Sequence, residues 1–223
     1  MSDYLEISKK AWECASEFSP SKEDVYPAHK IVQEFDSIHD LNVYEYGCGG
    51  GSDVMSYLRR GNTVTATDIV PKNLETTKKR IISEKLSLDK ANLVLLENSY
   101  PLPFPDNNFD IISSHGVLHH IKEVDPVIKE LYRVCKPGGF IYVMLYTDSL
   151  WNHHLPRVEH YVKTRGIDIY EAFCWCTDGE GTPYARCYTT EEACKFLTDV
   201  GFTVVDYNHW LEEDFFITVK GVK

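Results

Sequence analysis

Residues 43–68 read VYEYGCGGGSDVMSYLRRGNTVTATD and place four glycines within five residues, between a β-prone run and an amphipathic run. A strand that leads into such a turn and then into a helix presents free backbone N–H groups at the carboxyl edge of a sheet. Asp68 ends the next β-prone run, where an acid accepts hydrogen bonds from ribose hydroxyls in nucleoside-binding folds. The stretch predicts a nucleoside site, and a tight turn without any ligand is the alternative that it leaves open.

Apolar and β-branched runs alternate with helical patterns along most of the chain, which is typical of a parallel sheet with helices on both faces. A short loop joins the last two β-prone runs, so we expect them to form an antiparallel hairpin. The seven expected strands are residues 43–46, 63–67, 93–96, 109–113, 140–146, 202–207 and 215–219. The pattern predicts an α/β fold built around one sheet.

Local signals mark the ends of several predicted helices. Gly61 should stop the helix that follows the glycine turn, and Asp125-Pro126 predicts an N-cap with proline at the first helical position. Thr189 and Glu192 have the spacing of a capping box. Among the apolar stripes, we expect one that consists of Leu74, Ile81 and Ile82.

The composition narrows the class of protein. With 223 residues, of which 43% are hydrophobic, the chain can bury one sizeable core. A formal net charge of −11 argues against nucleic-acid binding, because phosphate recognition needs clustered Lys and Arg. No segment has the apolar length of a membrane span or a signal peptide, and seven scattered cysteines argue against a disulfide framework. We therefore expect a cytoplasmic protein.

Residues 147–189 carry many His, Trp, Tyr and Gly residues with little periodicity. A loop of that length in a compact domain is usually functional, so we interpret the segment as a substrate lid. The predicted organisation is an N-terminal helical cap over residues 1–40 and a ligand-binding domain over residues 41–223, into which the lid is inserted.

The spacing in the glycine turn separates two cofactor classes. A dinucleotide fingerprint would put Ser52 at its third glycine, whereas the turn fits acid-x-G-x-G-x-G through Glu45, Gly47, Gly49 and Gly51. Together with LPFPDNNFDII (102–112), HGVLHHI (115–121) and ELYRVCKPGGFIYV (130–143), this pattern resembles the class I S-adenosylmethionine-dependent methyltransferases. More narrowly, it resembles the type 11 methyltransferase domain. The resemblance implies a Rossmann-like, doubly wound, seven-stranded and mostly parallel sheet with an antiparallel C-terminal strand.

The resemblance also implies roles for individual residues around S-adenosylmethionine. The glycines would contact its methionine part, Glu45 its amino group and Asp68 its ribose, while Ile69 would be a wall for the adenine. Where the family has an acid for the adenine amine, this chain has Asn98-Ser99, a departure from the pattern. The cofactor-binding candidates are Glu45, Gly47, Cys48, Gly49, Gly51, Asp68, Ile69, Asn98, Ser99 and His115.

The candidates for catalysis and acceptor binding lie in later segments. His119 and His120, in the short helix expected after the fourth strand, and His154 are candidate bases, with a structural role as the alternative for the first two. By the resemblance, Tyr4, Trp12 and Tyr26 would close the site from the N-terminal side. The substrate-binding candidates are Tyr26, Tyr146, His153, His154, Tyr184 and Arg186. No metal site is predicted.

The leading hypothesis is a methyltransferase that acts on an oxygen or nitrogen of a small molecule. A non-catalytic S-adenosylmethionine sensor or partner subunit is the alternative from another class. Cys174, Cys176 and Cys187 raise a third hypothesis, arsenite methylation, because soft thiolates bind thiophilic substrates. The acidic balance favours a neutral or cationic acceptor, no membrane partner is expected, and a homodimer is the assembly that we consider.

Overall fold

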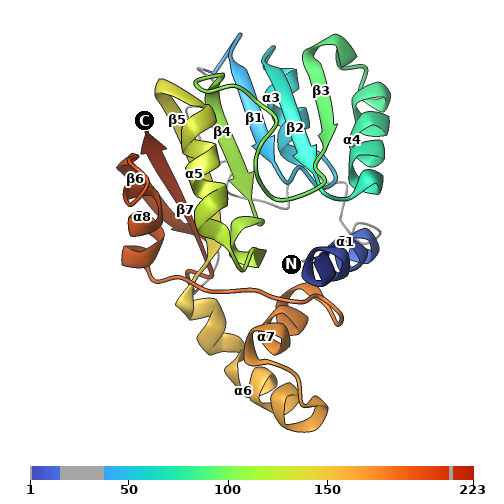
Figure 1. Cartoon of the computed structure of the whole chain (residues 1–223), viewed down its shortest axis with the longest axis vertical. Helices are drawn as coiled ribbons and strands as arrows, with labels where there is room; N and C mark the ends of the chain where they lie inside the picture. Colours follow the sequence, from blue (N-terminus) through green and yellow to red (C-terminus); the bar gives the residue numbers. More distant parts are fainter. Residues whose placement is uncertain (1, 16–37, 211–212) are drawn as a thin grey trace.

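The computed structural model describes residues 2–15, 38–210 and 213–223 (Figure 1). Its strands are β1 (Asn42–Tyr46), β2 (Thr63–Asp68), β3 (Ala91–Leu95), β4 (Phe109–His115), β5 (Cys135–Tyr146), β6 (Thr203–Trp210) and β7 (Phe216–Val222). They form one sheet in the order β3-β2-β1-β4-β5-β7-β6. Strand β7 runs antiparallel to both of its neighbours, and the other pairings are parallel. The predicted doubly wound sheet and the C-terminal hairpin are confirmed.

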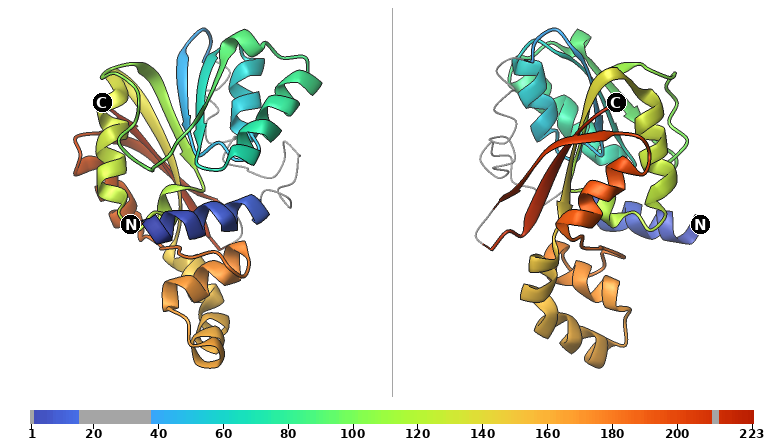
Figure 2. Two further views of the ribbon diagram at one scale, coloured as in Figure 1. Left: turned by 45° about the vertical axis from the view of Figure 1, so that its right-hand side comes forward. Right: turned by 90° about the vertical axis from the view of Figure 1, so that its left-hand side faces the viewer.

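Helices cover both faces of the sheet, as Figure 2 shows from two sides. Two pack on one face, α3 (Ser52–Arg59) and α4 (Pro71–Ser83), and two on the other, α5 (Val124–Val134) and α8 (Thr190–Thr198). The remaining helices are α1 (Ser2–Ala15), η2 (Leu88–Lys90), η3 (Leu118–His120), α6 (Asp148–Arg165) and α7 (Ile169–Asp178). Helix α1 crosses the carboxyl edge of the sheet, between the strand ends and α7 (Figure 1).

Each face of the sheet has its own apolar core. Under α5 and α8, Tyr44 and Phe109 stack with ring centroids 4.9 Å apart and are fully buried. Under α3 and α4, Met55 and Ile81 are fully buried. The burial of these apolar side chains is the main force that holds the strands in place, and with them the residues at the strand ends.

Two local predictions are wrong in detail. Ile82 is 55% exposed, so the apolar stripe of α4 passes through Ile81 without it. Helix α5 begins at Val124 with Glu123 as its N-cap, so Asp125 lies in the first turn instead of capping it. Because Asp125 is acidic, it still complements the positive end of the helix from that position. Gly61 follows the end of α3 at a φ of +81°, as predicted for a helix stop.

The capping box of α8 is confirmed. The Glu192 N–H donates to Thr189 Oγ1 at 3.2 Å, and the Thr189 N–H donates to Glu192 Oε2 at 2.9 Å. We expect Thr189→Ala to reduce the free energy of unfolding by about 1 kcal/mol, because one N–H of the first helical turn loses its acceptor. Urea unfolding measures this loss, and Thr189→Ser, which keeps the oxygen, should restore the wild-type value. An alanine variant as stable as wild type would contradict the assignment.

Most of the segment 147–189 is helical, with α6 and α7 spanning residues 148–165 and 169–178, which corrects its interpretation as a loop. Helices α6 and α7 pack together around Val158, Ala172 and Phe173, and they project beyond the carboxyl edge of the sheet (Figure 1). Only Leu150 and Val158 are buried among the 18 residues of α6. So few buried positions leave no periodic stripe, which is why the sequence pattern did not reveal the helix.

Among the N-terminal candidates, Tyr26 lies outside the described residues. Of the expected cap over residues 1–40, the structure describes α1. Among the helices it describes, none has both the length and the apolar character to cross a membrane.

Candidate active site

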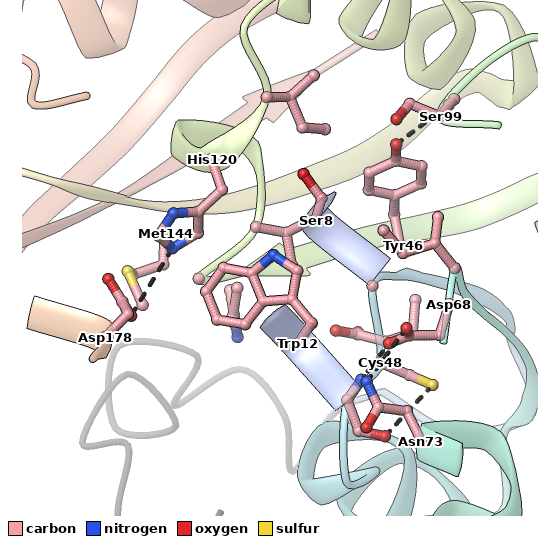
Figure 3. A pocket seen from close by; sticks show the side chains of 18 of the residues that line it. Ser8, Trp12, Tyr46, Cys48, Asp68, Asn73, Ser99, His120, Met144 and Asp178 are labelled. Atoms are coloured by element: carbon pink, nitrogen blue, oxygen red, sulfur yellow. Dashed lines mark hydrogen bonds and ion pairs between the residues drawn. The ribbon is translucent and has the colours of Figure 1, made fainter. Parts of the chain in front are cut away.

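A cavity of about 430 Å³ lies at the carboxyl ends of the strands, bounded by α1 and α7. Figure 3 shows that Trp12 from α1 lies between two groups of side chains, with Asp68, Cys48 and Asn73 on one side and His120 and Asp178 on the other. Both groups line the same cavity. A single space thus joins the glycine turn to residues of η3 and α7.

The glycine turn is held from behind by α4. Thr77 Oγ1 donates to the Gly49 carbonyl at 3.0 Å, and Arg80 Nη1 donates to the Gly50 carbonyl at 2.7 Å. Gly51 does not line the cavity: a Cβ built on it would lie 2.6 Å from Thr77 Oγ1, and its φ is +80°. The glycine requirement at this position comes from close packing against α4, which differs from the predicted ligand contact.

Asp68 is tied to the turn by its carboxylate. Oδ2 accepts from the Gly49 N–H at 2.9 Å, while Oδ1 accepts from the Val70 N–H at 2.8 Å and from Asn73 Nδ2 at 3.1 Å. Burial raises the pKa of Asp68, and the N–H donors of Val70 and Gly49 oppose that shift. A carboxylate offers about four acceptor positions, so Asp68 keeps capacity for a ligand hydroxyl.

A buried acid–imidazole cluster lies below the turn. His115 Nδ1 is 2.6 Å from Asp53 Oδ2, and Glu45 is buried beside this pair with no partner for Oε2 among the described residues. Burial and the neighbouring charge of Asp53 raise the pKa of Glu45 to about 8. For His115 burial is the largest effect and acts against protonation, but the charge of Asp53, its hydrogen bond to the ring and the charge of Glu45 together outweigh burial and raise the pKa. The cluster is thus poised to receive a cation at Glu45.

The cavity has two halves, one at the glycine turn and one at His120. In the first half, the end away from Glu45 is less polar. Ile69, Leu96 and Ser99 line it, and the Tyr46 hydroxyl donates to the Ser99 carbonyl at 3.0 Å. Asn98 is exposed and does not line the cavity, so the structure does not place it with the other cofactor-binding candidates.

The other half of the cavity centres on His120. Its Nδ1 lies 2.9 Å from the Tyr184 carbonyl, and its Nε2 lies 3.9 Å from Asp178 Oδ1, which also accepts from the Tyr146 hydroxyl at 2.9 Å. Two residues of helix α1 contact His120. The Tyr4 hydroxyl donates to the His120 carbonyl at 2.6 Å, and the Trp12 ring lies 4.7 Å from the imidazole.

The comparisons with known proteins agree with this geometry. A family described as "Methyltransferase domain" matches residues 44–143, which run from β1 into β5 and include the glycine turn, Asp68 and His120. This segment is a class I S-adenosylmethionine-dependent methyltransferase domain. The seven-stranded, mostly parallel sheet of the chain, with the C-terminal strand β7 antiparallel, is what the resemblance implied.

Relatives of the methyltransferase domain include two quinone-pathway enzymes of Chromobacterium violaceum. The chain is 31% identical over 165 residues to a ubiquinone/menaquinone biosynthesis C-methyltransferase, covering 72% of this chain and 64% of that protein. It is 27% identical over 146 residues to a ubiquinone biosynthesis O-methyltransferase, covering 63% and 62%. The chain therefore spans less than two thirds of the length of these relatives.

Solved structures share the fold of the methyltransferase domain and its surroundings. An S-adenosylmethionine-dependent methyltransferase from Methanosarcina mazei superposes with a TM-score of 0.68 at 22% identity, covering 90% of this chain and 98% of that one. A second, from Mesorhizobium loti, gives 0.68 at 16% identity and covers 91% and 100%.

S-adenosylmethionine is the methyl donor of this class, and the cavity fits it. The buried Glu45 Oε2 has no hydrogen-bond partner in the part of the chain that the structure describes, and it matches the donor's ammonium group. A Cβ on Gly49 would meet no protein atom within 4 Å, so the turn leaves room for a ligand against the backbone. Eight of the ten cofactor-binding candidates line the cavity: Glu45, Gly47, Cys48, Gly49, Asp68, Ile69, Ser99 and His115.

Of the three catalytic candidates, only His120 lines the cavity. His119 is fully buried and stacks on the Tyr146 ring at 3.7 Å, and burial together with His120 lowers its pKa well below the ordinary value. His154 packs against the Phe173 ring outside the cavity. A neutral, packed His119 matches the structural alternative rather than a base.

Most substrate-binding candidates also lie outside the cavity, and Tyr146 is the one that lines it among those described. His153 is exposed and forms an ion pair with Glu213 at 3.3 Å. Arg186 pairs with Glu192 at 3.4 Å, while Tyr184 reaches the site through its backbone carbonyl.

Some residues of the site were missed by the sequence analysis. Asp53 and Asn73 face the cavity from the first turns of α3 and α4, and Phe216 faces it from β7. An acid in a first turn usually complements the helix end, so its sequence position carried no signal for a ligand site. Cys174 lies in a group with His120 and Asp178, and neither Cys176 nor Cys187 belongs to that group. The three cysteines therefore do not form one cluster.

Proposed function

We propose that the protein transfers a methyl group from S-adenosylmethionine to an oxygen or nitrogen atom of a small molecule. The observation that carries the proposal is the single cavity, which joins the donor-binding residues to the polar pair His120 and Asp178 under α1. Direct displacement at a sulfonium needs the nucleophile, methyl carbon and sulfur in line. Holding reactants in that geometry can contribute up to about 7 to 11 kcal/mol.

The donor supplies an activated methyl group, and the residues of the first half of the cavity would hold it. Glu45 would pair with the ammonium group, and Gly47 and Gly49 would lie against the methionine part. Asp68 would accept from the ribose hydroxyls, with Ile69 and Ser99 at the adenine. His115 would act through Asp53 and Glu45 by keeping their combined charge low until the ammonium group arrives.

The second half of the cavity would hold the methyl acceptor. Trp12, Tyr146 and Phe216 give it aromatic walls, which suit a flat or apolar molecule. An acceptor hydroxyl or protonated amine must lose a proton on methylation, and among the described residues His120 is the basic side chain that lines this half of the cavity. A positioned base contributes about 10² to 10⁴ in rate. The net charge of −11 favours a neutral or cationic acceptor over an anionic one.

The proposal is tested first by calorimetry and then by turnover. We expect S-adenosylmethionine and S-adenosylhomocysteine to bind with one site per chain, and mass spectrometry to find methylated product from a panel of phenols, alcohols and amines. Binding without any product across the panel would favour a sensor or partner subunit instead. Failure to bind either nucleoside would contradict both functions.

A further inference from the structure

Three ligand-type side chains meet in the wall of the acceptor half of the cavity. His120 comes from η3, and Cys174 and Asp178 lie one turn apart on α7. One ligand atom from each lies within 4.8 Å of the others. Cys174 Sγ is 3.6 Å from Asp178 Oδ2 and 3.7 Å from His120 Nδ1. Figure 3 shows His120 and Asp178 pointing toward each other across this space.

The hydrogen bonds fix which atoms are free to bind. The Tyr184 carbonyl can only accept, so Nδ1 of His120 carries the proton and donates to it at 2.9 Å. In the neutral imidazole, Nε2 then bears a lone pair, and it faces a carboxylate oxygen of Asp178 at 3.9 Å. Two acceptors that face each other at this distance favour a positive group between them.

We propose that His120, Cys174 and Asp178 bind a divalent cation of the zinc class. Ligand atoms around one tetrahedral zinc ion are about 3.3 to 3.8 Å apart, given bond lengths of about 2.0 to 2.3 Å. The separation of 3.6 Å between Cys174 Sγ and Asp178 Oδ2 lies in that range, and the 3.9 Å between His120 Nε2 and Asp178 Oδ1 is close to it. Because Cys174 Sγ now lies 3.7 Å from the protonated Nδ1, binding also requires a side-chain rotation that brings Nε2 toward the sulfur. An imidazole, a thiolate and a carboxylate form a donor set that suits zinc, whereas magnesium and calcium prefer oxygen alone.

Charge balance supports an ion in this buried place. Binding of the ion forms the metal–sulfur bond and releases the thiol proton to solvent. One thiolate and one carboxylate then neutralise the two positive charges, and the buried site carries no net charge.

Partners of the three ligands already hold them in place, as in established metal sites. The Tyr184 carbonyl orients the imidazole, and the hydroxyls of Tyr146 and Thr177 donate to the Asp178 carboxylate. His120 and Asp178 line the cavity, so the fourth position of the ion would face it. This last step rests on the proposed function: an acceptor hydroxyl or thiol at that position would lose its proton to solvent more readily, and His120 would be a ligand instead of the base.

The test is a titration of the untagged protein with Co²⁺ in the absence of S-adenosylmethionine, so that its outcome does not depend on methyl transfer. We expect one equivalent to bind, with visible bands of tetrahedral cobalt and a thiolate-to-cobalt absorption in the near ultraviolet. Zn²⁺ should displace both signals. Cys174→Ser should remove the thiolate band and weaken binding by more than about 100-fold, beyond the 10- to 100-fold effect of losing a supporting partner.

Two further variants keep the proposal falsifiable. Asp178→Asn has nearly the same shape and should also weaken binding, while Cys176→Ser, two residues from Cys174 and outside the group, should bind like wild type. Circular dichroism checks that each variant is folded. The proposal is overturned by a wild type that gives no thiolate band, or by a band that survives Cys174→Ser. Either result would make the group a hydrogen-bonded thiol network.

Discussion

Glu45→Gln is expected to weaken the binding of S-adenosylmethionine and S-adenosylhomocysteine by about 100-fold. The variant keeps the shape of the side chain and removes the charge that would pair with the ammonium group. Losing one partner of a buried charge pair costs about 2 to 5 kcal/mol, and about 1.4 kcal/mol corresponds to a factor of ten. Titration calorimetry with S-adenosylhomocysteine, which has the same ammonium group and no reactive methyl, measures the effect without turnover.

The stability of the ligand-free variant is the control for this result. Because the pKa of Glu45 rises to about 8 in the folded protein, the native state keeps a proton that the unfolded chain has lost. The stability contributed by this proton is complete below the unfolded pKa and is lost as the pH rises through about 8. Glutamine does not titrate, so the urea midpoint of Glu45→Gln should rise relative to that of wild type as the pH increases from about 5 to about 9. A variant that is less stable at every pH would point to damaged packing as the cause of weak binding.

Gly47→Ala is expected to lower the free energy of unfolding by about 2 to 4 kcal/mol, from backbone strain and overpacking together. The φ of Gly47 is +77°, and a Cβ built there lies 2.5 Å from Val117 Cγ2. Its N–H also donates to the Thr67 carbonyl at 2.9 Å, so a displaced backbone would pull the turn away from β2. Urea unfolding measures the loss, and calorimetry should show weaker binding of S-adenosylhomocysteine.

Gly49 offers a matched control in the same turn. Its φ is +49°, but a Cβ there meets nothing within 4 Å, so Gly49→Ala should cost only the conformational part, about 1 kcal/mol. Adding Val117→Ala to Gly47→Ala removes the overlap and should recover part of the lost stability. Equal costs for the two single variants would show that steric overlap with Val117 contributes nothing.

The sheet could be predicted from the sequence because its signals are local. Each strand is a short apolar run next to a helical stripe, and the glycine turn, Glu45 and Asp68 all adjoin strand ends that meet at one edge. Cofactor-binding candidates chosen by this rule line the cavity. Two of the candidates lie away from the cavity, because Gly51 packs against α4 and Asn98 is exposed.

The acceptor half could not be read in the same way, because its contacts join remote segments. Asp178 lies 58 positions after His120 in the sequence, and the two meet only when α7 folds back under η3. The sequence also could not show which of His119 and His120 faces the cavity, because neighbouring residues of a short helix point in different directions. The fold buries His119 against Tyr146 and turns His120 to the cavity.

Helix α1 bears on how fast the product nucleoside would leave in the proposed reaction. Tyr4, Ser8 and Trp12 recur along one face of the helix, and that face forms a wall shared by both halves of the cavity. Under the proposed function, the contacts of Tyr4 and Trp12 with His120 would help to retain a spent nucleoside below this wall. The residence time of the product, rather than the chemical step, would then set the turnover rate, as in other enzymes where a lid must open.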